Sequence, residues 1–176
     1  TLRAAESSGE AVIDGPAGGL GKILLVEGSD IEINGFDIQF GTSDMVRQSD
    51  AYPGTAVRYC MIHDGLGDEG VQLKKCQNGV MEFNYVYDIA WAGDGLNFAE
   101  SQDCTIRFNE ITNISSDNAA IYVYGSENTS IIGNLIYNLP FGEGIKLGNK
   151  GGGDASLSGG LIKANLIYNV GGGNHD

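Results

Sequence analysis

The sequence has few basic residues and no long apolar run. Only 10 lysines and arginines stand against 23 aspartates and glutamates, which gives a formal net charge of −13. Because proteins that bind a phosphate backbone carry a basic stripe, this balance excludes nucleic acid as a partner and disfavours an anionic membrane. No apolar run reaches the roughly 18 residues that a membrane-spanning helix needs. The acidic charge is compatible with divalent cations or a neutral glycan as partners.

A secretory signal peptide is also absent, and Thr1 is not a natural translation start. We therefore interpret residues 1–176 as a single domain that is a processed product or a piece of a longer chain. Prolines number only 3, whereas the 28 glycines mostly separate short apolar runs. That distribution is typical of many short strands joined by turns.

A short unit of the form Ile-x-x-Asn-x-Ile recurs along the chain. It is clearest at residues 106–113, 131–138 and 162–169, with looser copies at 33–38, 57–64 and 81–88. The first apolar residues of these copies are 24 or 25 positions apart, except for one step of 31 between 131 and 162. Self-similarity at such a period marks a stacked repeat architecture, in which each unit buries its apolar face against its neighbours.

A second apolar segment follows each unit with the same period. Its first core positions are 46, 71, 96, 121 and 145, which again are 24 or 25 residues apart. Both segments are too short for helices and are rich in Ile, Val, Tyr and Phe, so they are predicted strands. The Ile-x-x-Asn-x-Ile unit divides into two strands bent at the asparagine. The sequence therefore predicts an all-β protein that is a parallel β-helix with about 24–25 residues per coil.

The asparagine of each unit is expected to stack on its counterpart in the next coil as an amide ladder. Because the bend requires a left-handed conformation that asparagine tolerates, we expect the asparagine itself to adopt it. The isoleucines on either side should fill the interior. The ladder residues are Asn84, Asn109, Asn134 and Asn165, and the predicted core residues are Ile106, Ile111, Ile131, Ile136, Ile162 and Ile167.

This repeat resembles the right-handed parallel β-helix of the pectate-lyase-like superfamily, over nearly the whole chain. The resemblance implies a right-handed single-stranded solenoid in an extracellular or cell-surface protein with a polysaccharide partner. The superfamily holds polysaccharide lyases, glycoside hydrolases, epimerases and non-catalytic surface proteins, so it does not imply one reaction. The sequence motifs that mark the catalytic sites of the superfamily's enzymes are absent from this sequence. These motifs are Asn-Thr-Asp with Gly-His-Gly, Asp-Pro-His-Glu, and Arg-x-Pro-x-x-Arg.

In that superfamily the strand after the longer turn faces a polysaccharide groove, and by position this strand is the second apolar segment. Because side chains alternate along a strand, its outward residues are candidates for substrate binding. These are Arg47, Gln72, Asn97, Tyr122 and Lys146, together with Lys74 just beyond the strand. Lys146 lies near Tyr122 and Glu143, so Lys146 and Tyr122 are the candidate catalytic residues, with Lys146 as base or acid. A solvated lysine on an exposed strand is the alternative.

An acidic column precedes the same strands. Asp44, Glu69 and Asp94 should stack on three successive coils about 4.8 Å apart, with Asp68 beside the middle one. Like charges at that spacing repel one another, and a hard cation such as Ca²⁺ relieves the repulsion through oxygen ligands. We therefore predict a calcium site there. The alternative is ordinary turn chemistry, since Asp and Glu are common before glycine.

Three cysteines are too few for a disulfide framework. Cys60 shares the column of Asn84 and should be buried, whereas Cys76 and Cys104 lie in neighbouring repeats three positions out of register, which leaves a disulfide between them open. Two functions from different classes also stay open. The protein binds or processes an extracellular polysaccharide, in a lyase-like reaction on acidic glycans with Ca²⁺. Alternatively it is a non-catalytic structural or adhesive β-helix that self-associates through uncapped coil ends.

Overall fold

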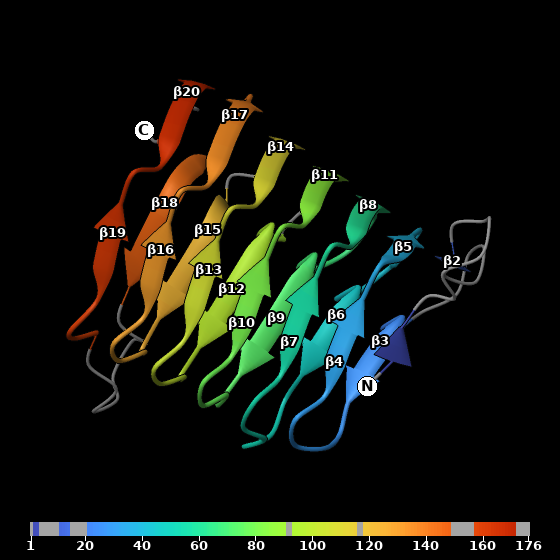
Figure 1. Ribbon diagram of the computed structural model, residues 1–176. Helices are drawn as coiled ribbons and strands as arrows, with labels where there is room; N and C mark the ends of the chain where they lie inside the picture. Colours follow the sequence, from blue (N-terminus) through green and yellow to red (C-terminus); the bar gives the residue numbers. More distant parts are fainter. Residues whose placement is uncertain are drawn as a thin grey trace.

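The protein is a solenoid of three parallel sheets, described here with a computed structural model (Figure 1). The structure describes residues 2–3, 11–14, 21–90, 93–115, 118–148 and 157–171. Each complete coil contributes one short strand to each sheet, and the coils stack from β3 at one end to β20 at the other (Figure 1). The predicted all-β right-handed parallel β-helix is confirmed. Within the described ranges, no helix is long and apolar enough to cross a membrane.

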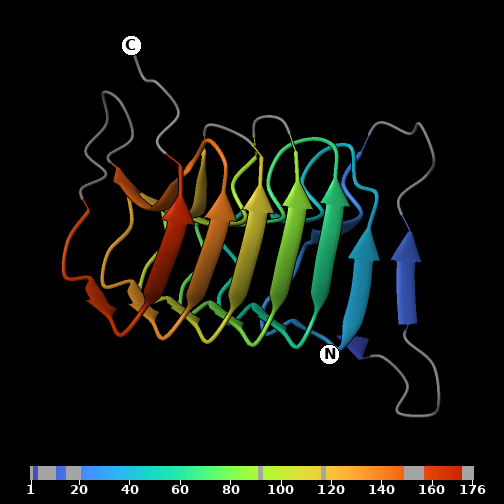
Figure 2. The same cartoon turned by 90° about the horizontal axis from the view of Figure 1, so that it is seen from above.

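The first sheet consists of the strand that precedes each corner asparagine. Its strands are β1 (Leu2–Arg3), β4 (Glu32–Asn34), β7 (Ala56–Arg58), β10 (Val80–Glu82), β13 (Thr105–Arg107), β16 (Ser130–Ile132) and β19 (Leu161–Lys163). The second sheet follows the asparagines and is the broad sheet in front in Figure 2. Its strands are β2 (Ala11–Asp14), β5 (Phe36–Gln39), β8 (Met61–Gly65), β11 (Tyr85–Ile89), β14 (Glu110–Ile114), β17 (Leu135–Leu139) and β20 (Leu166–Val170).

The third sheet consists of the second apolar segments of the sequence. Its strands are β3 (Leu24–Val26), β6 (Val46–Gln48), β9 (Val71–Lys74), β12 (Leu96–Ala99), β15 (Ala119–Tyr124) and β18 (Glu143–Gly148). All pairings within the three sheets are parallel between strands of successive coils. The prediction that the Ile-x-x-Asn-x-Ile unit bends into two strands is confirmed. The 31-residue step covers an insertion whose residues 149–156 lie outside the described ranges.

The inward columns form one continuous core, as the repeat predicts. Ile106, Ile111, Ile131 and Ile136 are at most 1% exposed. Ile131 and Ile136 pair in register with Ile162 and Ile167 of the last described coil. Those two side chains are 50% and 42% exposed, respectively, so the prediction that they are buried is wrong. They occupy the correct column, but the described residues place no further coil over them.

The corner between the first and second sheets is left-handed, but not at the asparagines. The positive φ angles fall one residue earlier, at 52° to 56° for Tyr59, Phe83, Phe108 and Ala164 and at 65° for Gly133. The prediction that the asparagine adopts this conformation is therefore wrong. The physical reason is that the asparagine side chain must point inward to join its column, so the chain makes its turn on the preceding, outward-pointing residue.

The amide ladder itself is confirmed. Asn84 Nδ2 donates to Asn109 Oδ1 at 3.0 Å, Asn109 Nδ2 donates to Asn134 Oδ1 at 3.0 Å, and Asn134 Nδ2 donates to Asn165 Oδ1 at 2.9 Å. Each acceptor oxygen also takes the backbone N–H of the preceding asparagine. Cys60 holds the equivalent position one coil before Asn84 and is 2% exposed, as predicted. The ladder satisfies backbone groups that the corner removes from the sheets.

Candidate functional site

The outward column of the third sheet stands in the predicted register. Arg47, Gln72, Asn97, Tyr122 and Lys146 are direct partners on successive strands from β6 to β18. Arg47 and Lys146 therefore lie four coils apart. Asp44, Glu69, Asp94, Ala119 and Glu143 occupy the start of the same strands or the turn before them. The two columns run parallel along one face of the solenoid.

In four of the five coils the two columns contact each other directly, and of these contacts the sequence suggested only Lys146 with Glu143. In these four coils the outward side chain reaches back to the acid three residues earlier. Arg47 Nη1 lies 2.6 Å from Asp44 Oδ2, Gln72 Nε2 lies 2.9 Å from Glu69 Oε1, Asn97 Nδ2 lies 3.1 Å from Asp94 Oδ2, and Lys146 Nζ lies 3.3 Å from Glu143 Oε1. The spacing of three was visible in the sequence, but it does not predict the pairs, because residues three apart on a straight strand point to opposite faces.

These pairs reduce how much of the column a ligand can reach. Asn97 is fully buried and Gln72 is only 7% exposed, whereas Arg47, Tyr122 and Lys146 are half-buried. Lys74, the further binding candidate, pairs through Nζ with Glu100 Oε1 at 3.4 Å. As the side chains stand, the accessible part of the column is at its two ends. Asn97 contributes hydrogen bonding inside the face rather than a contact surface.

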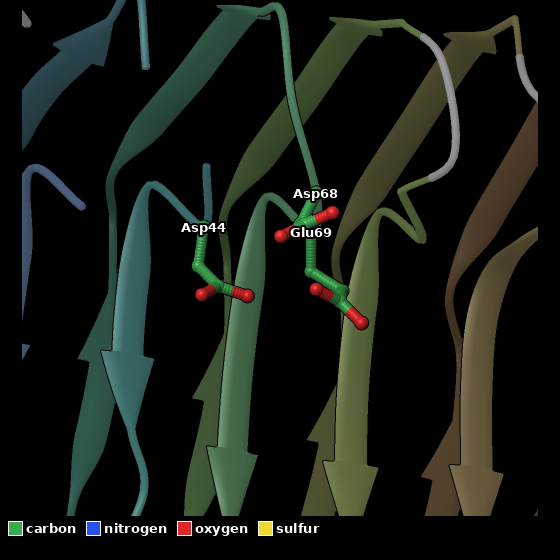
Figure 3. Close-up of side chains that lie close together, drawn as sticks. All are labelled: Asp44, Asp68 and Glu69. Atoms are coloured by element: carbon green, nitrogen blue, oxygen red, sulfur yellow. The ribbon is translucent and has the colours of Figure 1, made fainter. Parts of the chain in front are cut away.

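Three of the four predicted metal ligands converge. Asp44, Asp68 and Glu69 each place a carboxylate oxygen within 4.8 Å of the other two, just before strands β6 and β9 (Figure 3). Asp94 does not join them, because its Oδ1 accepts the backbone N–H of Ala119 at 2.9 Å and its Oδ2 accepts Asn97. Burial raises the pKa of Asp94 above its ordinary value. The other three carboxylates are the type of oxygen ligand that Ca²⁺ takes.

The carboxyl groups of Asp44 and Glu69 influence each other. Asp44 is fully buried, and its Oδ1 has no hydrogen-bond donor among the described residues. Burial, followed by the hydrogen bond to Asp44 and the charge of Asp44, raises the pKa of Glu69 to about 8. The burial of Glu69 and the neighbouring Asp44 charge thus both disfavour the ionised form of Glu69. Arg47 balances the remaining charge, and its hydrogen bond to Asp44 raises the pKa of the guanidinium.

The neighbouring turn explains why glycine stands at residue 93, the position that corresponds to Asp68 one coil further on. A Cβ at residue 93 would lie 1.8 Å from the carbonyl oxygen of Asp68, so a side chain cannot fit there. Ser43, on the other side, donates to Asp68 Oδ2 at 3.4 Å. Asp68 is exposed at the rim of the cluster.

Tyr122 and Lys146 form the second feature of this face. Lys146 Nζ lies 5.6 Å from the centroid of the Tyr122 ring, within the range of a cation–π contact. The Tyr124 ring lies 5.1 Å from the Tyr122 ring, and the Tyr122 hydroxyl lies over Gly148, where a Cβ would be 2.8 Å away. The structure thus brings together the two residues that the sequence proposed as catalytic. Glu143 completes the group through its ion pair with Lys146.

A histidine on the second sheet forms another cluster that sequence reasoning missed. His63 Nε2 lies 2.8 Å from Asp37 Oδ1, and His63 Nδ1 lies 2.7 Å from Asp64 Oδ2. The ring also stacks on Tyr87 at 4.6 Å. Both ring nitrogens are therefore occupied by carboxylates, so the imidazole has no nitrogen left for a substrate. The cluster links two successive strands, β5 and β8.

Comparison with known proteins identifies the family. The model of the right-handed β-helix region matches residues 23–174, and the chain belongs to this family. Among solved structures, the chain is similar to a putative glycosyl hydrolase from Parabacteroides merdae ATCC 43184, with a TM-score of 0.58 and 12% sequence identity. The match covers 90% of this chain and 83% of that protein. At this identity the likeness shows the fold alone. A search of curated proteins finds no match.

Proposed function

We propose that this protein binds an extracellular or cell-surface polysaccharide along the outer face of the third sheet. The observation that carries the proposal is a break in the repeated pairing. In the coils of β6, β9, β12 and β18 the outward side chain is held by its own acid, whereas β15 has Ala119 in the acid position. Tyr122 therefore presents its ring beside the Lys146 ammonium instead. A ring next to a cation is suited to a sugar and its carboxylate or hydroxyl groups.

Three acceptor atoms on this face support a ligand that brings donors or a cation. Asp44 Oδ1, Asn97 Oδ1 and Glu143 Oε2 are buried and have no hydrogen-bond donor among the described residues. Sugar hydroxyl groups supply donors, and a divalent cation supplies charge. The fold neighbour, described as a glycosyl hydrolase, agrees with a carbohydrate ligand.

We further propose that Asp44, Asp68 and Glu69 hold Ca²⁺, which would bridge the protein to the carboxylates of an acidic glycan. Their convergence within 4.8 Å and the unsatisfied Asp44 Oδ1 fit this role. Binding must displace the proton of Glu69, because burial raises the pKa of that group to about 8. Calcium should therefore release protons at neutral pH, and it should bind more tightly above pH 8 than at pH 6.

Binding is better supported than cleavage. Strand β18 lies three strands beyond β9 in the third sheet, so Lys146 is roughly 14 Å from the carboxylate cluster at 4.8 Å per coil. One sugar cannot reach both, but successive sugars of an extended chain can. A lyase-like reaction needs Lys146 to contact the sugar as a base, whereas its Nζ is engaged in the ion pair with Glu143. Cleavage would be detected as a rise in ultraviolet absorbance from unsaturated uronates.

Glycan-array binding with and without calcium tests the proposal. The Tyr122→Ala, Lys146→Ala double variant should lose binding to the glycans that the wild type retains. The matched control is the Tyr59→Ala, Lys163→Ala double variant, which removes an exposed tyrosine and an exposed lysine away from the third sheet. Equal binding by all three proteins, or none by any of them, would refute a ligand on this face.

Calcium has its own test. Isothermal titration with CaCl₂ should give binding and proton release for the wild type, and neither for Asp68→Asn, Glu69→Gln. Asp30→Asn, Glu27→Gln is the control, because it removes the same charges outside the cluster. If the melting temperature in chelator equals that in millimolar calcium, the cluster is turn chemistry.

The alternative function, a structural or adhesive β-helix, is favoured by one observation. Leu161, Ile162, Leu166 and Ile167 of β19 and β20 are 42% to 59% exposed. An apolar coil face of this kind pairs with a further coil or a second chain. Concentration-dependent association in sedimentation, abolished by Ile162→Lys, combined with no glycan binding, would support it.

A further inference from the structure

Two buried thiols meet in the turn that leads into the first sheet. Cys76 follows β9 and Cys104 precedes β13, and both are 1% exposed. The backbone N–H of Gly79 donates to Cys104 Sγ at 3.3 Å, and Cys104 Sγ lies 3.5 Å from the carbonyl oxygen of Cys76. A Cβ built on Gly79 would lie only 2.8 Å from Cys76 Sγ. Both sulfur atoms therefore lie against the same glycine.

The offset of three residues in register is what brings the sulfur atoms together. Cys76 is opposite Ser101 of the next coil, since its N–H donates to Ser101 Oγ at 3.0 Å. Cys104 is opposite Gly79, and the missing side chain at that position opens the space between the two thiols. Residue 79 thus has to be glycine for the cysteines of successive coils to approach.

We propose that Cys76 and Cys104 are a disulfide-forming pair that clamps two successive coils when the protein meets a small disulfide oxidant. In this structure all three cysteines are unbridged. The inference does not depend on the polysaccharide proposal, because the pair lies inside the solenoid. It does predict which compartment suits the protein, since such a bridge persists in an oxidising environment.

The chemistry is thiol–disulfide exchange. The Cys76 thiolate attacks one sulfur of oxidised glutathione, which releases one glutathione thiol and leaves a mixed disulfide. Cys104 then loses its proton to solvent and attacks the Cys76 sulfur, which releases the second glutathione thiol. Two protein thiols are oxidised and one glutathione disulfide is reduced. Hydrogen bonding from Cys104 lowers the pKa of Cys76 to about 7, which makes Cys76 the attacking group, while the same contact raises the pKa of Cys104.

Cys60 does not take part. It lies at the corner between the first and second sheets, and burial raises the pKa of its thiol. Its Sγ lies 3.2 Å from the carbonyl oxygen of Arg58. It is therefore the internal control for the reactivity of a buried thiol in this protein.

The next coil supplies the matched variants. Ser101 and Thr129 hold the positions that correspond to Cys76 and Cys104. Cys76→Ser and Cys104→Thr therefore insert residues that the same turn already accepts. The intact wild-type chain and both variants would be refolded in a mixture of oxidised and reduced glutathione, and a parallel sample would be fully reduced.

We expect the oxidised wild type to lose two alkylatable thiols and to keep Cys60. Cleavage at acidic residues is needed to map the bridge, because no Lys or Arg lies between residues 76 and 106 and trypsin leaves both cysteines in one peptide. The oxidised form should melt about 5–15 °C above the reduced form, the gain expected for closing a loop of this length. Neither variant should show this difference. Three alkylatable thiols after oxidation, a bridge that includes Cys60, or an unchanged melting temperature would each overturn the proposal.

Discussion

Replacement of Asn109 by alanine tests whether the amide ladder stabilises the solenoid. Asn109 is 1% exposed and lies in the middle of the ladder. Its Oδ1 accepts the backbone N–H and the Nδ2 of Asn84, each at 3.0 Å. Its Nδ2 donates to Met81 O at 2.9 Å and to Asn134 Oδ1 at 3.0 Å. The backbone bonds of residue 109 survive the substitution: its N–H donates to Asn134 Oδ1, and its carbonyl accepts the Leu135 N–H at 2.9 Å.

The size of the destabilisation depends on which buried groups the substitution leaves without a hydrogen-bond partner. The Asn84 N–H loses its acceptor in the interior, and an orphaned buried donor costs about 1–3 kcal/mol. The remaining lost bonds leave groups with another partner or a second lone pair, and each contributes about 0.5–1 kcal/mol. We therefore expect Asn109→Ala to lower the free energy of unfolding by about 2.5–6 kcal/mol. Urea unfolding followed by circular dichroism measures this loss.

The control is Asn34→Ala, which removes a half-buried asparagine from the first sheet. Its side chain makes one hydrogen bond, to Glu32 Oε1 at 2.9 Å, so the expected loss is below about 1 kcal/mol. If Asn109→Ala and Asn34→Ala destabilise the protein equally, the ladder merely fills space, and the argument from buried backbone groups is refuted.

Two further predictions concern the core and the acidic cluster. Ile131→Ala should cost about 2–5 kcal/mol in urea unfolding, whereas Ile162→Ala, at 50% exposure in the same column, should cost much less. Equal costs would contradict the burial that we describe. The pKa of Glu69 rises from 4.5 to about 8 on folding, so between these values the folded state binds a proton that the unfolded state has lost. The free energy of unfolding, measured in chelator to exclude calcium, should therefore fall as the pH rises from about 4.5 to 8. Glu69→Gln should remove that slope, because an amide does not titrate in this range. An unchanged slope would assign the pH dependence to other groups.

The strands and their register could be predicted from the sequence because each coil repeats the same inward choices. The apolar column from Ile33 through Met81 to Ile131 is set by one requirement, which is burial against the coil above and below. Successive copies therefore confirm one another in the sequence. Burial of Asn97 could not be predicted in this way. It depends on the side chains around it and on the hydrogen bond to Asp94, and neither follows from the alternation of a strand.

The candidate site was predictable as two columns but not as a set of pairs. The sequence placed Asp44 before Arg47 and Glu69 before Gln72, yet residues three apart on a straight strand point to opposite faces. They meet here because the acid lies in the turn, before the strand begins at Val46 or Val71. The chain bends between the acid and the residue that it contacts. That bend belongs to the turn through which the chain enters the third sheet, and neither residue type causes it. The convergence of Asp68 with Asp44 has the same origin.

The left-handed corner shows how a repeat overrides local preference. Phe83 and Phe108 adopt φ of 55°, a conformation that costs a residue with a Cβ about 1–2 kcal/mol. Local preference would place the turn on the asparagine, because asparagine tolerates a left-handed conformation. Placing it there would direct the amide out of the solenoid and leave the Asn84 and Asn109 backbone N–H groups without acceptors. The cost of the positive φ at the aromatic residue is smaller than the cost of leaving those buried N–H groups unsatisfied. It is also partly offset by stacking of the aromatic rings: the Phe83 ring lies 5.3 Å from the Phe108 ring and 5.1 Å from the Tyr59 ring. The corner therefore follows from the ladder, and the exposed aromatic column follows from the corner.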